Sequence, residues 1–168
     1  MHPKSILFSL FFCFALLECA AQERVVTPLP PFPEGFLNAR WGTSIDGVKE
    51  AIAADGHRWF QDDTENPPFA SYASGTYLNA PAIISYFFTP KSKRLFRVDV
   101  TFNDPKLYEA ARGYLIQRFK APTFSQTDTD LWAWEDNSLL IVQKDSNKVQ
   151  ISYSPGPFLR LNHQESAG

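Results

Sequence analysis

The strongest constraint on the fold is a stretch, residues 94–102, in which apolar and polar side chains alternate. Successive side chains of a β-strand point to opposite faces, so a strand here would bury one face and leave the other polar. A second apolar stretch, residues 83–89, precedes it, and residues 90–93 fit a hairpin loop between them. The pair predicts an antiparallel sheet. Its apolar face would carry Phe96, Val98, Val100 and Phe102, and its polar face Arg97, Asp99 and Thr101.

A helix is predicted before these strands. Thr43 is a favourable N-cap residue, and Gly56 is a favourable terminator. Between them Ile45, Val48 and Ile52 fall on one face at helical spacing.

A second helix is predicted after the strands. Asp104 would cap it, and Pro105 would occupy its first turn, where the missing N–H costs nothing. The helix would end before Pro122. Its apolar stripe consists of Leu107, Ala111, Tyr114, Leu115 and Phe119.

Further strands are predicted over residues 69–78, 130–135, 139–144 and 148–153, separated by turn residues such as Asp136-Asn137. The order is then α-β-β(-β)-α-β-β-β. Strand groups joined by short hairpins, with helices between the groups, favour an α+β fold: one antiparallel sheet with two helices packed on one face.

The N-terminal segment is typical of a secretory signal peptide. Lys4 precedes an apolar run over residues 6–17, and small residues precede a cleavage site between Ala21 and Gln22. The run is too short for a membrane span, which needs about 20 apolar residues. An uncut anchor is the alternative, and a lipid anchor at Cys19 is a third reading, although Glu18 departs from the lipobox pattern.

Both cysteines, Cys13 and Cys19, precede the predicted cleavage site, so the mature chain would contain no disulfide and no thiolate site. The predicted organisation is a signal peptide over 1–21, a Pro-rich extended arm over 22–35, one domain over 36–158 and a flexible tail over 159–168. We expect a periplasmic or secreted protein with no transmembrane span in the mature chain.

Residues 36–44, Phe-Leu-Asn-Ala-Arg-Trp-Gly-Thr-Ser, followed by Val48, resemble the opening of small exported bacterial proteins of unknown function. In those proteins a Trp-Gly-polar-Ser step leads into a helix and then into β-hairpins. The element order is also similar to that of the small lipoprotein of the outer-membrane barrel-assembly machine and of the β-lactamase inhibitor protein. The resemblance implies a fold and a compartment, and it carries no catalytic residues.

Charge argues against nucleic-acid binding, because 16 Lys and Arg stand against 18 Asp and Glu without a basic run. We predict no cofactor, no metal site and no catalytic residues. His57 and His163 lie in separate parts of the chain, and no nucleophile motif is present. Asp62 and Asp63 are predicted in an acidic loop that lacks the spacing and glycine of a calcium loop.

Two tryptophans form a possible ligand site. Trp132 and Trp134 are two apart on a predicted strand, so they would share a face. They would either fill the core or form a platform that stacks on a sugar or another small ligand.

A partner-binding patch is predicted on the second face of the sheet. The strands at 83–89 and 139–144 are apolar on both faces, unlike the strand at 94–102. The second face would carry Ile83 and Phe87 with Leu139 and Ile141. Either the Pro-rich arm covers these side chains, or they are exposed and receive a partner.

We therefore expect an exported, non-enzymatic envelope module that binds an envelope protein or a small ligand. One alternative is a small periplasmic hydrolase or lyase that uses carboxylates such as Asp62, Asp63 and Asp136. The other is a carbohydrate or small-ligand binder that uses Trp132 and Trp134.

Overall fold

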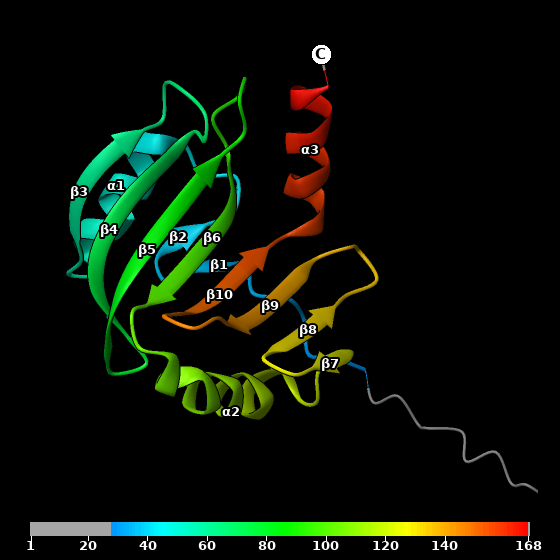
Figure 1. Ribbon diagram of the computed structural model, residues 1–168. Coiled ribbons are helices and arrows are strands. Elements are labelled where there is room, and N and C mark those ends of the chain that lie inside the picture. The colour runs from blue at the N-terminus through cyan, green and yellow to red at the C-terminus, as the bar shows by residue number, and fades with distance from the viewer. Residues whose placement is uncertain (1–27, 168) are drawn as a thin grey trace, which may run out of the picture.

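The computed structural model of the chain describes residues 28–167 (Figure 1). It contains an antiparallel sheet of eight strands, a separate two-stranded sheet and three α-helices, so the α+β class is confirmed. The large sheet has the strand order β3-β4-β5-β6-β10-β9-β8-β7. Its strands are β3 (Arg58–Asp63), β4 (Ala70–Tyr77), β5 (Ala80–Phe88), β6 (Leu95–Phe102), β7 (Phe124–Gln126), β8 (Thr129–Ala133), β9 (Leu139–Lys144) and β10 (Val149–Ser154). The small sheet pairs β1 (Gly35–Phe36) with β2 (Ala39–Arg40).

The hairpin predicted over residues 83–102 is present as β5 and β6, which pair antiparallel. Val98, Val100 and Phe102 on the predicted apolar face are buried. Phe96 is the exception. The register shifts at Phe87 and Phe88, so Phe96 has no partner opposite it and is only half-buried.

Helix α1 (Ile45–Ala54) begins one residue later than predicted, because Ser44 and not Thr43 is its N-cap. The Ser44 hydroxyl accepts a hydrogen bond from the N–H of Gly47. The helix ends where Gly56 adopts a φ of +69°, in the left-handed region that glycine tolerates best.

The second predicted helix is present in two parts. Asp104 caps a short 3₁₀ turn, η1 (Pro105–Leu107), and accepts a hydrogen bond from the N–H of Lys106. Helix α2 (Tyr108–Phe119) follows directly. In Figure 1, α2 runs beneath β8–β10, and α1 lies beside β3 and β4.

Three predictions about elements were wrong. Residues 62 and 63 belong to strand β3 and not to a loop. The predicted flexible tail at 159–168 forms most of helix α3 (Gly156–Ser166). The third wrong prediction is the element order, which omits β3, β7 and α3. It also omits the short β1–β2 pair.

The hydrophobic core draws on both halves of the sheet and on α1 and α2. Ile52 of α1 and Leu115 of α2 are fully buried in the same cluster as Ile84 and Ile151. Burial of this apolar surface is the main stabilising contribution.

Residues 1–27 lie outside the described part of the chain. The predicted signal peptide over 1–21, the possible lipid anchor at Cys19 and the first residues of the arm fall in this region. Among residues 28–167, no helix has the length and apolar character needed to cross a membrane.

Candidate functional site

Trp132 and Trp134 do not form the predicted ligand platform. Trp132 is fully buried, and its indole Nε1 donates a 3.0 Å hydrogen bond to the carbonyl oxygen of Lys120. The ring of Trp134 packs edge-on against Phe119 and Phe32, at centroid distances of 5.8 and 4.9 Å. Trp132 is a core residue, and Trp134 is partly buried and packs against the core. A sugar therefore cannot stack on the pair.

The carboxylates of the predicted hydrolase do not converge. Asp62 forms a 2.8 Å ion pair with Lys49 of α1. Burial raises the pKa of Asp62, but its hydrogen bonds with Lys49 and Thr64 outweigh that effect and lower the pKa. Asp136 lies in the turn between β8 and β9, where it accepts hydrogen bonds from the N–H and hydroxyl of Ser138. These carboxylates stabilise separate local structures.

Metal-binding side chains are not gathered in the described part of the chain. Within residues 28–167, no group of three or more His, Cys, Asp and Glu residues is placed to hold a metal ion.

The four predicted patch residues lie on one face of the sheet. On β5, Phe87 pairs with Arg97 and Ile83 pairs with Thr101 of β6. On β9, Ile141 pairs with Ser152 and Leu139 with Ser154 of β10. Directly opposed residues of antiparallel strands share a face. We call this surface, which carries Ile83, Phe87, Arg97, Asp99, Leu139, Ile141 and Ser152, the open face.

A polar network occupies the middle of the open face. Asp99 is 5% exposed, and it accepts a 2.7 Å hydrogen bond from Nε of Arg97 and a 3.0 Å bond from Nε2 of Gln150. The Arg97 guanidinium also lies 5.0 Å from the centroid of the Phe87 ring, a cation–π contact. The buried carboxylate is thus fully partnered, and the network holds β6 to β10 and orients Phe87.

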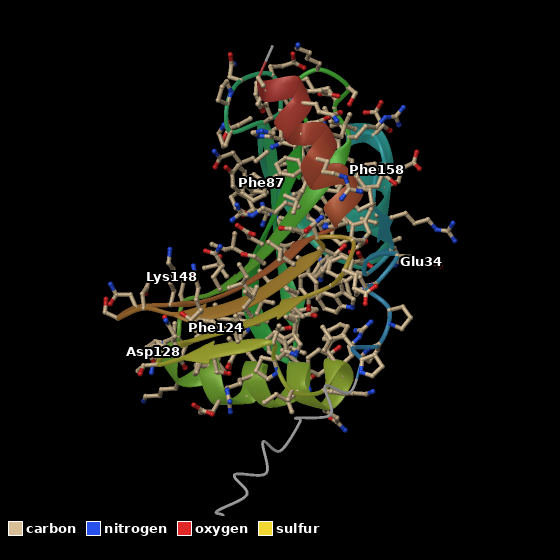
Figure 2. The ribbon with its side chains drawn as sticks, turned by 90° about the vertical axis from the view of Figure 1, so that its right-hand side faces the viewer. Glu34, Phe87, Phe124, Asp128, Lys148 and Phe158 are labelled. Carbon is tan, nitrogen blue, oxygen red and sulfur yellow. The ribbon has the colours of Figure 1, made fainter. Side chains whose placement is uncertain are left out.

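Apolar side chains flank this network on both sides. Ile83, Phe87, Leu139 and Ile141 are each half-buried, so part of each side chain reaches the surface. Figure 2 shows β8–β10 projecting away from the upright strands β3–β6, on the side where Phe87 lies. The open face therefore lies on the inside of a bend in the sheet.

A cavity of about 560 Å³ adjoins the open face at Ile83. Sequence reasoning did not identify it, because its lining comes from strand ends and turns with no shared motif. The lining residues are Ser74, Gly75, Asn79, Ala80, Pro81, Ala82, Ile83, Thr101, Asn103, Asp104 and Leu107.

The described part of the Pro-rich arm runs elsewhere. The carbonyl oxygen of Pro28 accepts a hydrogen bond from Nζ of Lys120. The carbonyl oxygens of Pro30 and Pro33 accept hydrogen bonds from the indoles of Trp134 and Trp41, respectively. Its side chains Leu29 and Phe32 pack against the hydrophobic core. The reading in which the arm covers the patch is therefore wrong for residues 28–36. These residues form their hydrogen bonds and ring contacts with the side of the domain that carries Trp41 and Trp134.

Comparison with known proteins identifies no relative: no protein-family model, no curated protein and no solved structure matches the chain.

Proposed function

We propose that this chain is an exported, non-catalytic envelope module that receives a protein partner on the open face. The signal-peptide pattern of the N-terminal segment supports export to the periplasm or beyond the cell. The resemblance of residues 36–44 to small exported bacterial proteins is in line with that compartment. The proposal takes α1 and α2 to cover the opposite face of the sheet, which their burial in one core supports.

One observation carries the proposal. Half-buried Ile83 and Phe87 face Leu139 and Ile141 across a polar network, on a surface that the described arm does not cover. Partial burial holds these side chains in place, so binding would cost little side-chain entropy. Protein interfaces have this anatomy: ordered apolar anchors, surrounded by satisfied polar groups.

The cavity beside Ile83 strengthens the choice of a protein over a sugar. A concave site next to an apolar patch suits a projecting side chain of a partner, and such sites are frequent energetic centres of interfaces. Trp132, in contrast, is fully buried, so it and Trp134 offer no two-ring stacking surface to a sugar.

The test compares capture by the wild-type chain, Phe87→Asp and Leu37→Asp in an envelope fraction, followed by calorimetry with the purified partner. Leu37 is 50% exposed on the turn between β1 and β2, so it is a matched apolar-to-acidic control outside the open face. We expect Phe87→Asp to weaken binding at least tenfold, about 1.4 kcal/mol, with Leu37→Asp unchanged. Equal binding by all three chains would refute the open face as the site.

A further inference from the structure

The edge strand β3 is largely exposed. Five of its six residues are exposed, and among them Trp59 and Phe60 are 45% and 49% exposed. β4 pairs with one side of β3, and no strand among residues 28–167 pairs with the other. Figure 1 shows β3 at the outer edge of the sheet, with α1 beside it. β3 lacks lysine and proline, which protect many natural edge strands, but it carries Arg58, Asp62 and Asp63, and its pairing with β4 shifts register at Phe60.

The face that each β3 side chain occupies is fixed by its pairing with β4. Arg58 and Asp63 pair with Ser74 and Ala70, which share the open face with Ile83 and Phe87. Trp59 and Asp62 pair with Ala73 and Ser71 on the other face. Gln61 pairs with Tyr72 on the open face. Phe60 has no partner on β4, because the register shifts there, and its ring lies 6.4 Å from the Tyr72 ring, so it is also on the open face.

This assignment makes the strand self-complementary. When two copies of β3 pair antiparallel about a two-fold axis between Phe60 and Gln61, Arg58 lies opposite Asp63 of the second copy. The opposed residues then share a face at every position, because the register shift in β3 puts the two successive residues at the axis, Phe60 and Gln61, on the same face. A shift by one residue would set Arg58 opposite Asp62, which points to the other face. The register with matching faces is thus also the register with two Arg–Asp pairs.

We propose that β3 is a self-association site, through which two copies of this chain form a symmetric dimer with one continuous sheet. A two-fold interface closes on itself, so the association stops at the dimer. Charge complementarity selects a second copy as the occupant: the two Arg58–Asp63 pairs lie at the ends of the interface. On the other face, each Trp59 would lie opposite Asp62 of the second copy.

The proposal is independent of the proposed function, because four strands separate β3 from β9 and β3 carries none of the patch residues. Dimerisation would set the two open faces side by side on one sheet. A partner with two-fold symmetry could then contact both.

A charge-swap series tests the interface by sedimentation velocity over a range of concentrations. The chain used begins at Gln22 and contains every element described above. Arg58→Asp sets two aspartates opposite each other and should weaken the dimer about tenfold. Arg58→Asp combined with Asp63→Arg restores opposite charges at both ends, so the affinity should return to within about threefold of wild type.

Lys148→Asp is the matched control, because it makes the same change in charge on the turn between β9 and β10, in the far half of the sheet (Figure 2). It should leave the dimer unchanged. Rescue by the double swap also excludes misfolding as the cause of the loss in Arg58→Asp. A wild-type chain that stays monomeric at every concentration overturns the proposal. So does a dimer that Arg58→Asp leaves intact, since it would use another surface.

Discussion

The indole Nε1 of Trp134 donates a 2.6 Å hydrogen bond to the carbonyl oxygen of Pro30, across 104 positions of sequence. The ring of Phe32 packs edge-on against the same indole. The described arm is therefore part of the folded domain, although its proline content predicts only an extended segment.

The first prediction concerns this contact. Trp134→Phe keeps most of the ring and removes the donor, so it should lower the free energy of unfolding by about 0.5–1.5 kcal/mol in urea denaturation. In a chain that lacks residues 22–33, the acceptor is already gone, and the same substitution should cost almost nothing further. Additive losses in the two backgrounds would contradict the hydrogen bond as the cause.

The parts of the fold that the sequence predicted are those with a buried face. β6 was located by its alternating apolar pattern, which packing of one face against the core requires, and β9 by its continuous apolar run. β3 was missed for the converse reason: almost all of it is exposed, so no packing requirement shapes its pattern.

Helix α3 was missed because Pro155 and Pro157 suggest a break in regular structure. The second of these prolines lies in the first turn of α3, where its lack of an N–H is tolerated. What holds the helix is tertiary: the Phe158 ring occupies the space that a side chain at Gly42 would fill. A contact between positions so far apart has no local signature.

The candidate site was predicted in part. Apolar residues on both faces of β5 and β9 pointed to Ile83, Phe87, Leu139 and Ile141, which the structure places on one face. The sequence could not decide what covers them. The arm is held through the backbone carbonyls of Pro28, Pro30 and Pro33. Every residue has a backbone carbonyl, so the sequence contains no pattern that marks these three as hydrogen-bond acceptors.

The second prediction concerns the core under α2. Leu115 is fully buried, in the cluster that also contains Phe102 and Val142. Leu115→Ala should cost about 2–5 kcal/mol in urea denaturation, because it removes buried methyl groups and leaves a cavity. Ile116→Ala on the same helix is a control, since Ile116 is only partly buried and should cost less. A loss below about 0.5 kcal/mol for Leu115→Ala would place the wrong face of α2 in the core.

The third prediction concerns Asp130, which is 1% exposed and joins the β7–β8 hairpin to α2. Its carboxylate pairs with Arg112 and accepts hydrogen bonds from the hydroxyls of Tyr108 and Ser125. Asp130→Ala leaves all three donors without this acceptor, so it should destabilise the fold by about 1–3 kcal/mol. Asp128→Asn is the control, because it keeps a residue that tolerates the φ of +64° at this position, and the exposed Asp128–Lys144 pair should contribute less than about 1 kcal/mol. Equal costs for the two variants in urea denaturation would count against Asp130 as the organising group.

The last prediction concerns pH and the end of α3. Oε2 of Glu165 accepts hydrogen bonds from the N–H groups of Lys91 and Ser92, at 2.7 and 2.9 Å, and Oε1 accepts one from the Ser92 hydroxyl. Burial raises the pKa of Glu165, but these hydrogen bonds outweigh it and lower the pKa to about 2. Because the folded pKa lies below the ordinary value of 4.5, the contribution to stability is complete above about pH 4.5. It is lost as the pH falls toward 2.

Amide chemical shifts of Lys91 and Ser92, followed by NMR as the pH is lowered, measure this directly. In the wild-type chain they should titrate with a midpoint near 2, and in Glu165→Gln this transition should disappear. Glu109→Gln on α2 is the control and should leave the titration unchanged, because Glu109 is in the first turn of a different helix. A midpoint near 4.5 would mean that the carboxylate accepts no hydrogen bonds that favour its charged form.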